Sequence, residues 1–162
     1  MRVAAGLLIL VICSAWGFRR SLLLNRRCAL LRELRLLVEQ YSIEISCTAP
    51  TLAELAGNSG GEFGRLLCEC SGSETDIRRA WSNAVDRLSA EPGCGSEEVS
   101  LLRELGRELG TCPAESQLAL LKLYSARFDK LISAAEKSAE QQGRMYRSGG
   151  VLAGLGAAVM LL

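Results

Sequence analysis

The cysteines are the residues whose chemistry would be most distinctive. The chain has seven cysteines and no histidine, and only Cys68 and Cys70 lie close together in the sequence. Their single intervening residue is not the two-residue gap of zinc knuckles or thioredoxin-like sites, and no second pair completes a set of four ligands. We therefore interpret both thiols as structural. A membrane-tethered thiol enzyme using Cys68 and Cys70 is our third-ranked hypothesis.

Carboxylates are the other side chains that could carry acid-base or metal chemistry. The candidates are Glu39 and Glu44 on the first expected helix, and Glu104 and Glu108 on the fifth. Each has basic neighbours on an expected solvated face, which predicts surface ion pairs. The sequence has no phosphate-binding loop, nucleophile elbow or dinucleotide fingerprint. We expect no catalytic, cofactor-binding or metal-binding residue and no enzyme activity.

The overall composition indicates a helical protein that does not bind nucleic acid. The 19 basic and 18 acidic residues give a net charge of +1, whereas nucleic-acid binding would favour a basic surplus. Aromatic residues make up only 5% of the chain, and leucine, alanine, glutamate and arginine dominate, which favours helices over strands. The odd number of scattered cysteines is typical of a reducing, cytosolic compartment.

The N-terminal stretch is uncharged and bordered by arginines. Val3–Phe18 carries no charge and lies between Arg2 and the pair Arg19 and Arg20. As a helix it would be about 24 Å long, shorter than a ~30 Å hydrocarbon core unless the arginines extend to the interface. A cleaved signal peptide is the alternative, but the stretch ends without a small-x-small cleavage site. We expect residues 1–18 to form a retained transmembrane anchor.

The C-terminal stretch is also uncharged. Gly149–Leu162 consists of apolar residues and glycines, and it follows Arg144 and Arg147. We expect residues 148–162 to form a second transmembrane anchor. Three small residues at a spacing of four would lie on one face and could pack against another membrane helix in a homo-oligomer, although ordinary glycine tolerance explains them equally well. They are Gly150, Gly154 and Ala158.

Arginines cluster at the end of each stretch that adjoins the middle of the chain, and this bias predicts an orientation. The positive-inside rule places residues 19–147 in the cytoplasm and both termini outside. The cytoplasmic part would stand on the inner membrane surface. The arginines that carry the argument are Arg19, Arg20, Arg26, Arg27, Arg144 and Arg147.

Between the two stretches the apolar residues recur at helical spacing and predict six helices. We expect Pro50 in the first turn of the second helix, a capping box from Ser73 to Asp76 before the fourth, and Ser96 as the cap of the fifth. We expect Gly110 to end the fifth helix. The predicted helices are Leu22–Ile45, Pro50–Ala56, Glu62–Cys70, Glu74–Leu88, a fifth between Ser96 and Gly110, and Gln117–Gln142. Together they predict an all-α, antiparallel six-helix bundle.

Several short runs of residues resemble one protein family, the stage III sporulation protein AB family of endospore-forming bacteria. The runs extend through nearly the whole chain, and the last, before the glycine-rich C-terminus, is the most specific. They are Glu44-Ile45 with Leu52, Ala80-Trp81, Leu105-Gly106-x-x-Leu109-Gly110 with Glu115-x-Gln117, and Gly143-Arg144-Met145-Tyr146-Arg147-Ser148-x-Gly150.

The resemblance implies more than the periodicities do. Family members look like the cytoplasmic domain of secretion F-type platform proteins. They belong to a channel apparatus that joins mother cell and forespore, beside a secretion-type ATPase of the same operon. The resemblance therefore implies a scaffold in the mother-cell membrane around the forespore, with the ATPase, other channel subunits and lipid as partners. An F-type platform of a type II secretion or type IV pilus system is the second hypothesis, although such proteins usually carry two copies of the domain.

Overall fold

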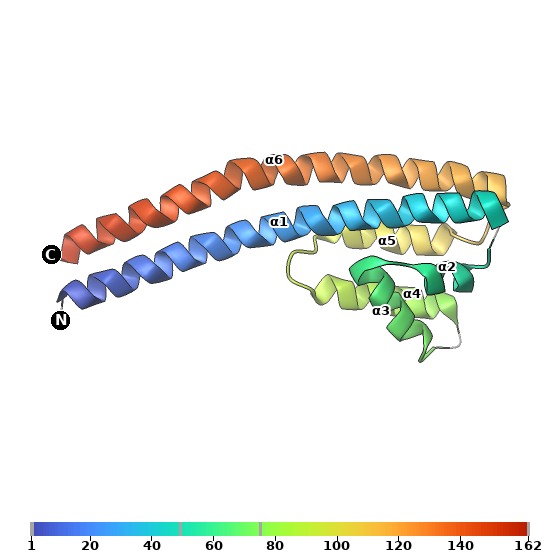
Figure 1. Cartoon of the computed structure of the whole chain (residues 1–162), viewed down its shortest axis with the longest axis horizontal. Coiled ribbons are helices and arrows are strands. Elements are labelled where there is room, and N and C mark those ends of the chain that lie inside the picture. The colour runs from blue at the N-terminus through green and yellow to red at the C-terminus, as the bar shows by residue number, and fades with distance from the viewer. Residues whose placement is uncertain (1, 49, 75, 162) are drawn as a thin grey trace. The chain divides into compact units, whose positions relative to one another are not determined.

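The computed structural model describes the backbone of residues 2–48, 50–74 and 76–161, and the side chains of residues 15–16, 18–48, 50–74, 76–142 and 145. These residues form six helices and no strand (Figure 1), which confirms the predicted all-α class. The helices are α1 (Arg2–Thr48), α2 (Leu52–Asn58), α3 (Gly61–Ser71), α4 (Ile77–Ala90), α5 (Ser96–Glu108) and α6 (Ala114–Leu161).

The chain divides into two compact units. One contains residues 29–132, and the other contains residues 1–28 with 133–162. In the first unit the segments of α1 and α6 run antiparallel, and α2 to α5 lie on one side of them (Figure 1). Within that group α3 packs against α2 and α4, and α4 packs against α5.

The core of the unit formed by residues 29–132 follows the apolar spacing of the sequence. The stripe predicted on the first helix is buried throughout, as is most of the stripe predicted on the fourth helix, because residues three and four apart share one helix face. Burying each large aliphatic side chain contributes about 1.5–3 kcal/mol. The buried residues are Leu30, Leu34, Leu37, Val38, Tyr41 and Ile45 on α1, and Ala80, Trp81, Ala84, Val85 and Leu88 on α4.

Trp81 joins four of the helices. Its indole contacts the ring of Phe63 edge-on at a centroid distance of 5.0 Å, and the ring of Tyr41 lies 6.3 Å away. The indole Nε1 donates a buried hydrogen bond of 2.8 Å to the carbonyl oxygen of Leu102 on α5. Gly106 leaves the space that the ring occupies, since a Cβ at this position would overlap the indole. One side chain therefore fixes α1, α3, α4 and α5 against one another.

Helix α2 begins later than predicted. Pro50 lies before the helix, and Thr51 is the N-cap: its hydroxyl accepts from the amide of Glu54, whose carboxylate accepts from the Thr51 amide at 2.7 Å. This reciprocal pair is a capping box, which satisfies two amides that have no partner within the helix. The helix extends through Asn58, so the prediction of Pro50–Ala56 was wrong at both ends.

Two other predicted helix starts were also wrong. The predicted capping box from Ser73 to Asp76 does not form, because the Ser73 hydroxyl donates to the carbonyl oxygen of Cys70 at the end of α3. Asp76 itself caps α4 by accepting from the amide of Arg78 at 3.0 Å. Ser96 is the first residue of α5 and not its cap, which is Gly95. The predicted end of the fifth helix was right: Gly110, with φ of 77°, follows α5.

Each of the two terminal helices joins segments that were predicted separately, and for the first helix this continuation was expected. The predicted segments Leu22–Ile45 and Gln117–Gln142 are parts of α1 and α6, each of which continues as one helix into the terminal stretch. Among the described residues, no helix has a section both long and apolar enough to cross a bilayer. The predicted anchors at residues 1–18 and 148–162 fall almost entirely outside the residues whose side chains the structure describes.

Candidate partner-binding surface

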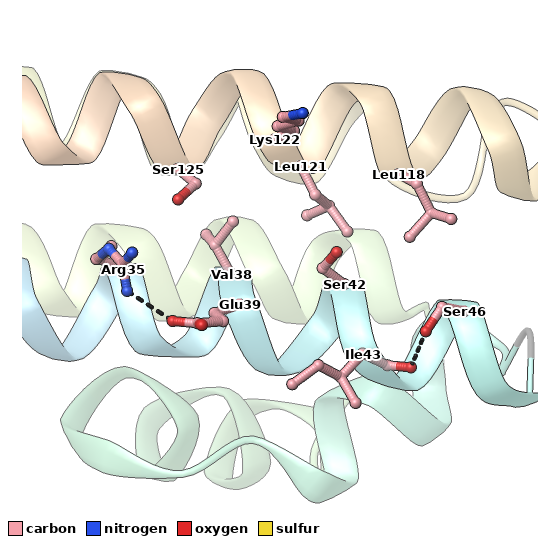
Figure 2. A pocket seen from close by; sticks show the side chains of 10 residues that line it. All are labelled: Arg35, Val38, Glu39, Ser42, Ile43, Ser46, Leu118, Leu121, Lys122 and Ser125. Carbon is pink, nitrogen blue, oxygen red and sulfur yellow. Dashed lines mark hydrogen bonds and ion pairs between the residues drawn. The ribbon is translucent and has the colours of Figure 1, made fainter.

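An open groove runs between α1 and α6 in the unit of residues 29–132. Its volume is about 420 Å³. Figure 2 shows Leu118 and Leu121 directed from α6 toward α1, and Val38 directed from α1 toward α6. Val38 and Leu121 are buried, so the floor of the groove is apolar. The groove is lined by Arg35, Val38, Glu39, Ser42, Ile43, Ser46, Leu118, Leu121, Lys122 and Ser125.

Charged side chains line the rim of this groove. Arg35 forms an ion pair of 2.6 Å with Glu39, one turn along α1, and one of 2.9 Å with Asp129 on α6. The hydrogen bond to Asp129, and then the nearby carboxylate charges, raise the pKa of Arg35. Lys122, on the α6 side, forms no ion pair with any residue that the structure describes. The contact between Arg35 and Asp129 links α1 to α6 at this point.

The groove has the chemistry of a protein-contact surface. Serine hydroxyls and the amine of Lys122 are candidate nucleophiles in its lining, and the chain has no histidine to act as a base. The hydroxyl of Ser46 donates to the carbonyl oxygen of Ile43 at 2.7 Å (Figure 2). An apolar floor inside a charged and hydroxylated rim resembles the core and rim of a protein interface.

The two cysteines singled out from the sequence point into different surroundings. Cys68 is exposed on α3, whereas Cys70 is buried in the core. Both are free thiols. Their one-residue separation places them about 200° apart around the helix, which explains why one reaches solvent and the other does not. The structure therefore does not bring them together on one accessible surface.

The four glutamates singled out from the sequence are all engaged with neighbouring side chains. The predicted ion pairs are present for two of them: Glu39 binds Arg35, and Glu104 binds Arg127 at 3.2 Å. For the other two the structure instead shows neutral donors. Gln40 donates to Glu44 at 2.8 Å, and the Tyr124 hydroxyl donates to Glu108 at 3.2 Å.

Glu44 and Glu54 line a second hollow, of about 540 Å³, at the end of α1. Glu44 also accepts from the side-chain amide of Asn58 at 3.3 Å. Hydrogen bonds from the backbone amide and hydroxyl of Thr51 lower the pKa of Glu54. Both carboxylates therefore stabilise the connection between α1 and α2. Among the described residues, no three His, Cys, Asp or Glu side chains gather as a metal site would require.

The small-residue stripe predicted at the C-terminus lies outside the residues whose side chains the structure describes. This applies to Gly150, Gly154 and Ala158. Their role in a homo-oligomer stays a prediction.

Most of the described residues that carry the family resemblance have structural roles. Ala80 and Trp81 are buried, Gly106 accommodates the indole, and Leu105 and Leu109 are buried beside it. Gly110 ends α5 in the left-handed backbone region, which side chains other than glycine rarely adopt. The runs thus specify how α4 and α5 meet.

The family model described as stage III sporulation protein AB matches residues 2–162. The chain belongs to this family. Membership gives it a role related to sporulation. Comparison with curated proteins returned no match, and neither did comparison with solved structures.

Sequence reasoning missed the groove altogether. Val38 and Leu121 are apolar residues at helical spacing and are buried, but the sequence alone does not pair Arg35 with Asp129 or bring Lys122 to the rim. A signal was available for one part of this surface. Leu36 and Ile43 are apolar, seven residues apart and off the core stripe of their helix, a pattern that indicates a second contact face.

Proposed function

We propose that this member of the family is a membrane-anchored scaffold of the sporulation channel, in the mother-cell membrane around the forespore. It would couple a cytoplasmic secretion-type ATPase to the other channel subunits. The observation that carries the proposal is the continuity of α1 and α6, each of which leads from the bundle into an uncharged terminal stretch. The bundle would thus be joined directly to both terminal stretches.

The membrane location is supported by the charge pattern of the sequence. Val3–Phe18 and Gly149–Leu162 are uncharged, and arginines cluster on the side of each stretch that leads to the bundle. The positive-inside rule then puts the bundle in the cytoplasm, where a secretion-type ATPase would meet it. The two terminal stretches would lie in the lipid bilayer.

A role without catalysis is supported by what the polar side chains do. The glutamates that could have served as acids or bases participate in ion pairs and in hydrogen bonds with neighbouring side chains. A scaffold needs these contacts for its shape and needs no reactive group. We therefore propose that the chain supplies binding and positioning, while the ATPase supplies the energy.

Retention of the ATPase by the full chain tests the proposal. The tagged full-length protein, purified in detergent, is incubated with the ATPase encoded in the same operon, with and without ATP, and recovered on affinity resin. We expect the ATPase to be retained. Trp81→Ala removes the indole that joins four helices and is the control, since loss of the folded bundle should abolish retention. An ATPase that never stays with the intact wild-type chain contradicts the proposal.

Replacement of the two neighbouring thiols separates the scaffold from a thiol enzyme. We expect Cys68→Ser with Cys70→Ser to leave sporulation efficiency unchanged if the protein is a scaffold. Because Cys70 is buried, Cys70→Ala is the companion variant that avoids placing a hydroxyl in the core. Loss of sporulation by a variant with a normal thermal melt would favour the enzyme.

A further inference from the structure

Exposed hydrophobic side chains in the unit of residues 29–132 gather on two helix faces. The large ones among the described residues are Leu36, Ile43 and Leu123, with exposed fractions of 61%, 59% and 51%. Leu36 and Ile43 lie seven residues apart on the face of α1 opposite its core stripe, and Figure 2 shows Ile43 directed away from α6. A spacing of seven keeps two side chains on one seam of a helix, as in coiled coils.

The second face is on α6 and combines one leucine with small residues. Leu123 lies between Ala119 and Ala126, and all three are exposed. Small residues beside a leucine leave room for a large side chain of a neighbouring helix. We name the surface formed by Ala29, Leu36, Glu39 and Ile43 the α1 face, and the surface formed by Ala119, Lys122, Leu123, Ala126 and Lys130 the α6 face.

The charges of the two faces are complementary. Glu39 lies between the two large residues of the α1 face, with half of its side chain exposed. Lys122 and Lys130 flank Leu123 and Ala126 on the α6 face, and neither forms an ion pair with any residue that the structure describes. The α1 face thus has a half-exposed carboxylate, which also binds Arg35 of the same helix, where the α6 face has ammonium groups.

The register within one copy predicts how a second copy would meet it. The helices are antiparallel, and Figure 2 shows Ser125 facing the turn of Arg35 and Val38, and Leu121 facing the turn of Ser42, next to Ile43. Copies anchored in one membrane stand at the same height, a condition that rests on the proposed function. Ile43 of one copy then falls between Ala119 and Leu123 of the next.

In the same register the remaining contacts also match. Leu36 falls beside Ala126, and Glu39 comes within reach of Lys122. We propose that the α1 face of one copy docks on the α6 face of a second copy of this chain. Pairing two α1 faces in parallel would instead place one Glu39 against the other and leave Leu123 exposed. The interface is heterologous, so repetition of it builds a ring or an open row.

Photo-crosslinking tests the proposal without the ATPase, so its outcome is separate from that of the retention experiment. The full chain carries p-benzoylphenylalanine at position 43, and it is irradiated in native membranes. We expect a covalent dimer on a denaturing gel, with the crosslink mapped by mass spectrometry to residues 119–130. The same group at position 53, exposed on α2, is the control and should give no dimer. Absence of the dimer, or a crosslink elsewhere, overturns the proposal.

Charge exchange tests the predicted pairing of Glu39 with Lys122. We expect Glu39→Lys to lower the crosslinking yield about fivefold, as an exposed pair of opposite charges is lost. Because Glu39 also binds Arg35, the folded state of the variant is checked by circular dichroism. Adding Lys122→Glu to the same chain should restore the yield. A double variant that crosslinks no better than Glu39→Lys contradicts this pairing.

Discussion

Gly106 is a position on α5 where a Cβ would overlap Trp81, and the cost of adding one can be predicted. Gly106→Ala should reduce the free energy of unfolding by about 1–3 kcal/mol, because the added methyl overlaps the indole and forces the ring from its place. This cost exceeds the gain of up to ~1 kcal/mol that alanine brings to a helix. Urea unfolding of the full chain in detergent, followed by circular dichroism, measures it. Gly57→Ala, on α2 with open space around it, is the control and should not destabilise.

Tyr41 predicts how stability changes at high pH. Burial raises the pKa of Tyr41 to about 12, although its hydrogen bond with Ser59 opposes the shift. The unfolded tyrosine ionises near pH 10. The free energy of unfolding therefore keeps its full value below pH 10 and falls as pH rises toward 12. Two units correspond to about 2–3 kcal/mol.

The change with pH is measured as urea unfolding of the full chain at pH 9 and pH 11. The drop in stability between these two pH values should be smaller for Tyr41→Phe than for the wild type, because phenylalanine cannot ionise. The pKa of Tyr124 is also raised to about 12, first by desolvation and then by Glu108, so part of the drop remains. An equal drop in both proteins would contradict the role of Tyr41.

At the level of helices, the start of α2 depends on one capping box. Thr51→Ala should lower the free energy of unfolding by about 1 kcal/mol, because the amide of Glu54 loses its acceptor. Ser96→Ala is the matched control: Ser96 caps nothing, so we expect a change within about 0.5 kcal/mol. Thermal melts of both variants in detergent compare them. Equal melting temperatures would show that the cap contributes nothing.

The helix caps show how far the sequence predicts the helices. Helix interiors were predicted well, because burial of a stripe depends only on spacing along the chain. Helix starts were predicted poorly, because Ser, Thr and Asp near a start all fit a cap, and the geometry of the preceding loop selects among them. Thr51 and Asp76 became caps, while Ser73 bonded back to the helix before it.

Across the whole molecule, the candidate surface could be predicted only in part. The seven-residue spacing of Leu36 and Ile43 is visible in the sequence, but their relation to α6 is not. Arg35 and Asp129 lie on helices far apart in the chain, and only the tertiary fold brings them within 2.9 Å. The proposed pairing of Glu39 with Lys122 depends on how α1 and α6 are aligned, and the local sequence does not show this alignment.

The exposed thiols of the bundle allow its orientation to be measured, and this prediction bears on the whole molecule. Cys47, Cys68 and Cys112 are exposed. If the bundle is cytoplasmic, a membrane-impermeant maleimide should leave these thiols unmodified in intact protoplasts and label them after permeabilisation. Replacing all three with serine is the control and should remove most of that labelling.

A cysteine placed beyond the first predicted anchor checks the opposite side. Arg2→Cys, in the variant lacking the three exposed thiols, should be labelled from outside without permeabilisation, since both termini are predicted to lie there. Labelling of Cys68 in intact protoplasts would reverse the orientation and remove the basis for a cytoplasmic ATPase partner. Labelling of neither position from outside would show instead that the N-terminal stretch does not cross the membrane.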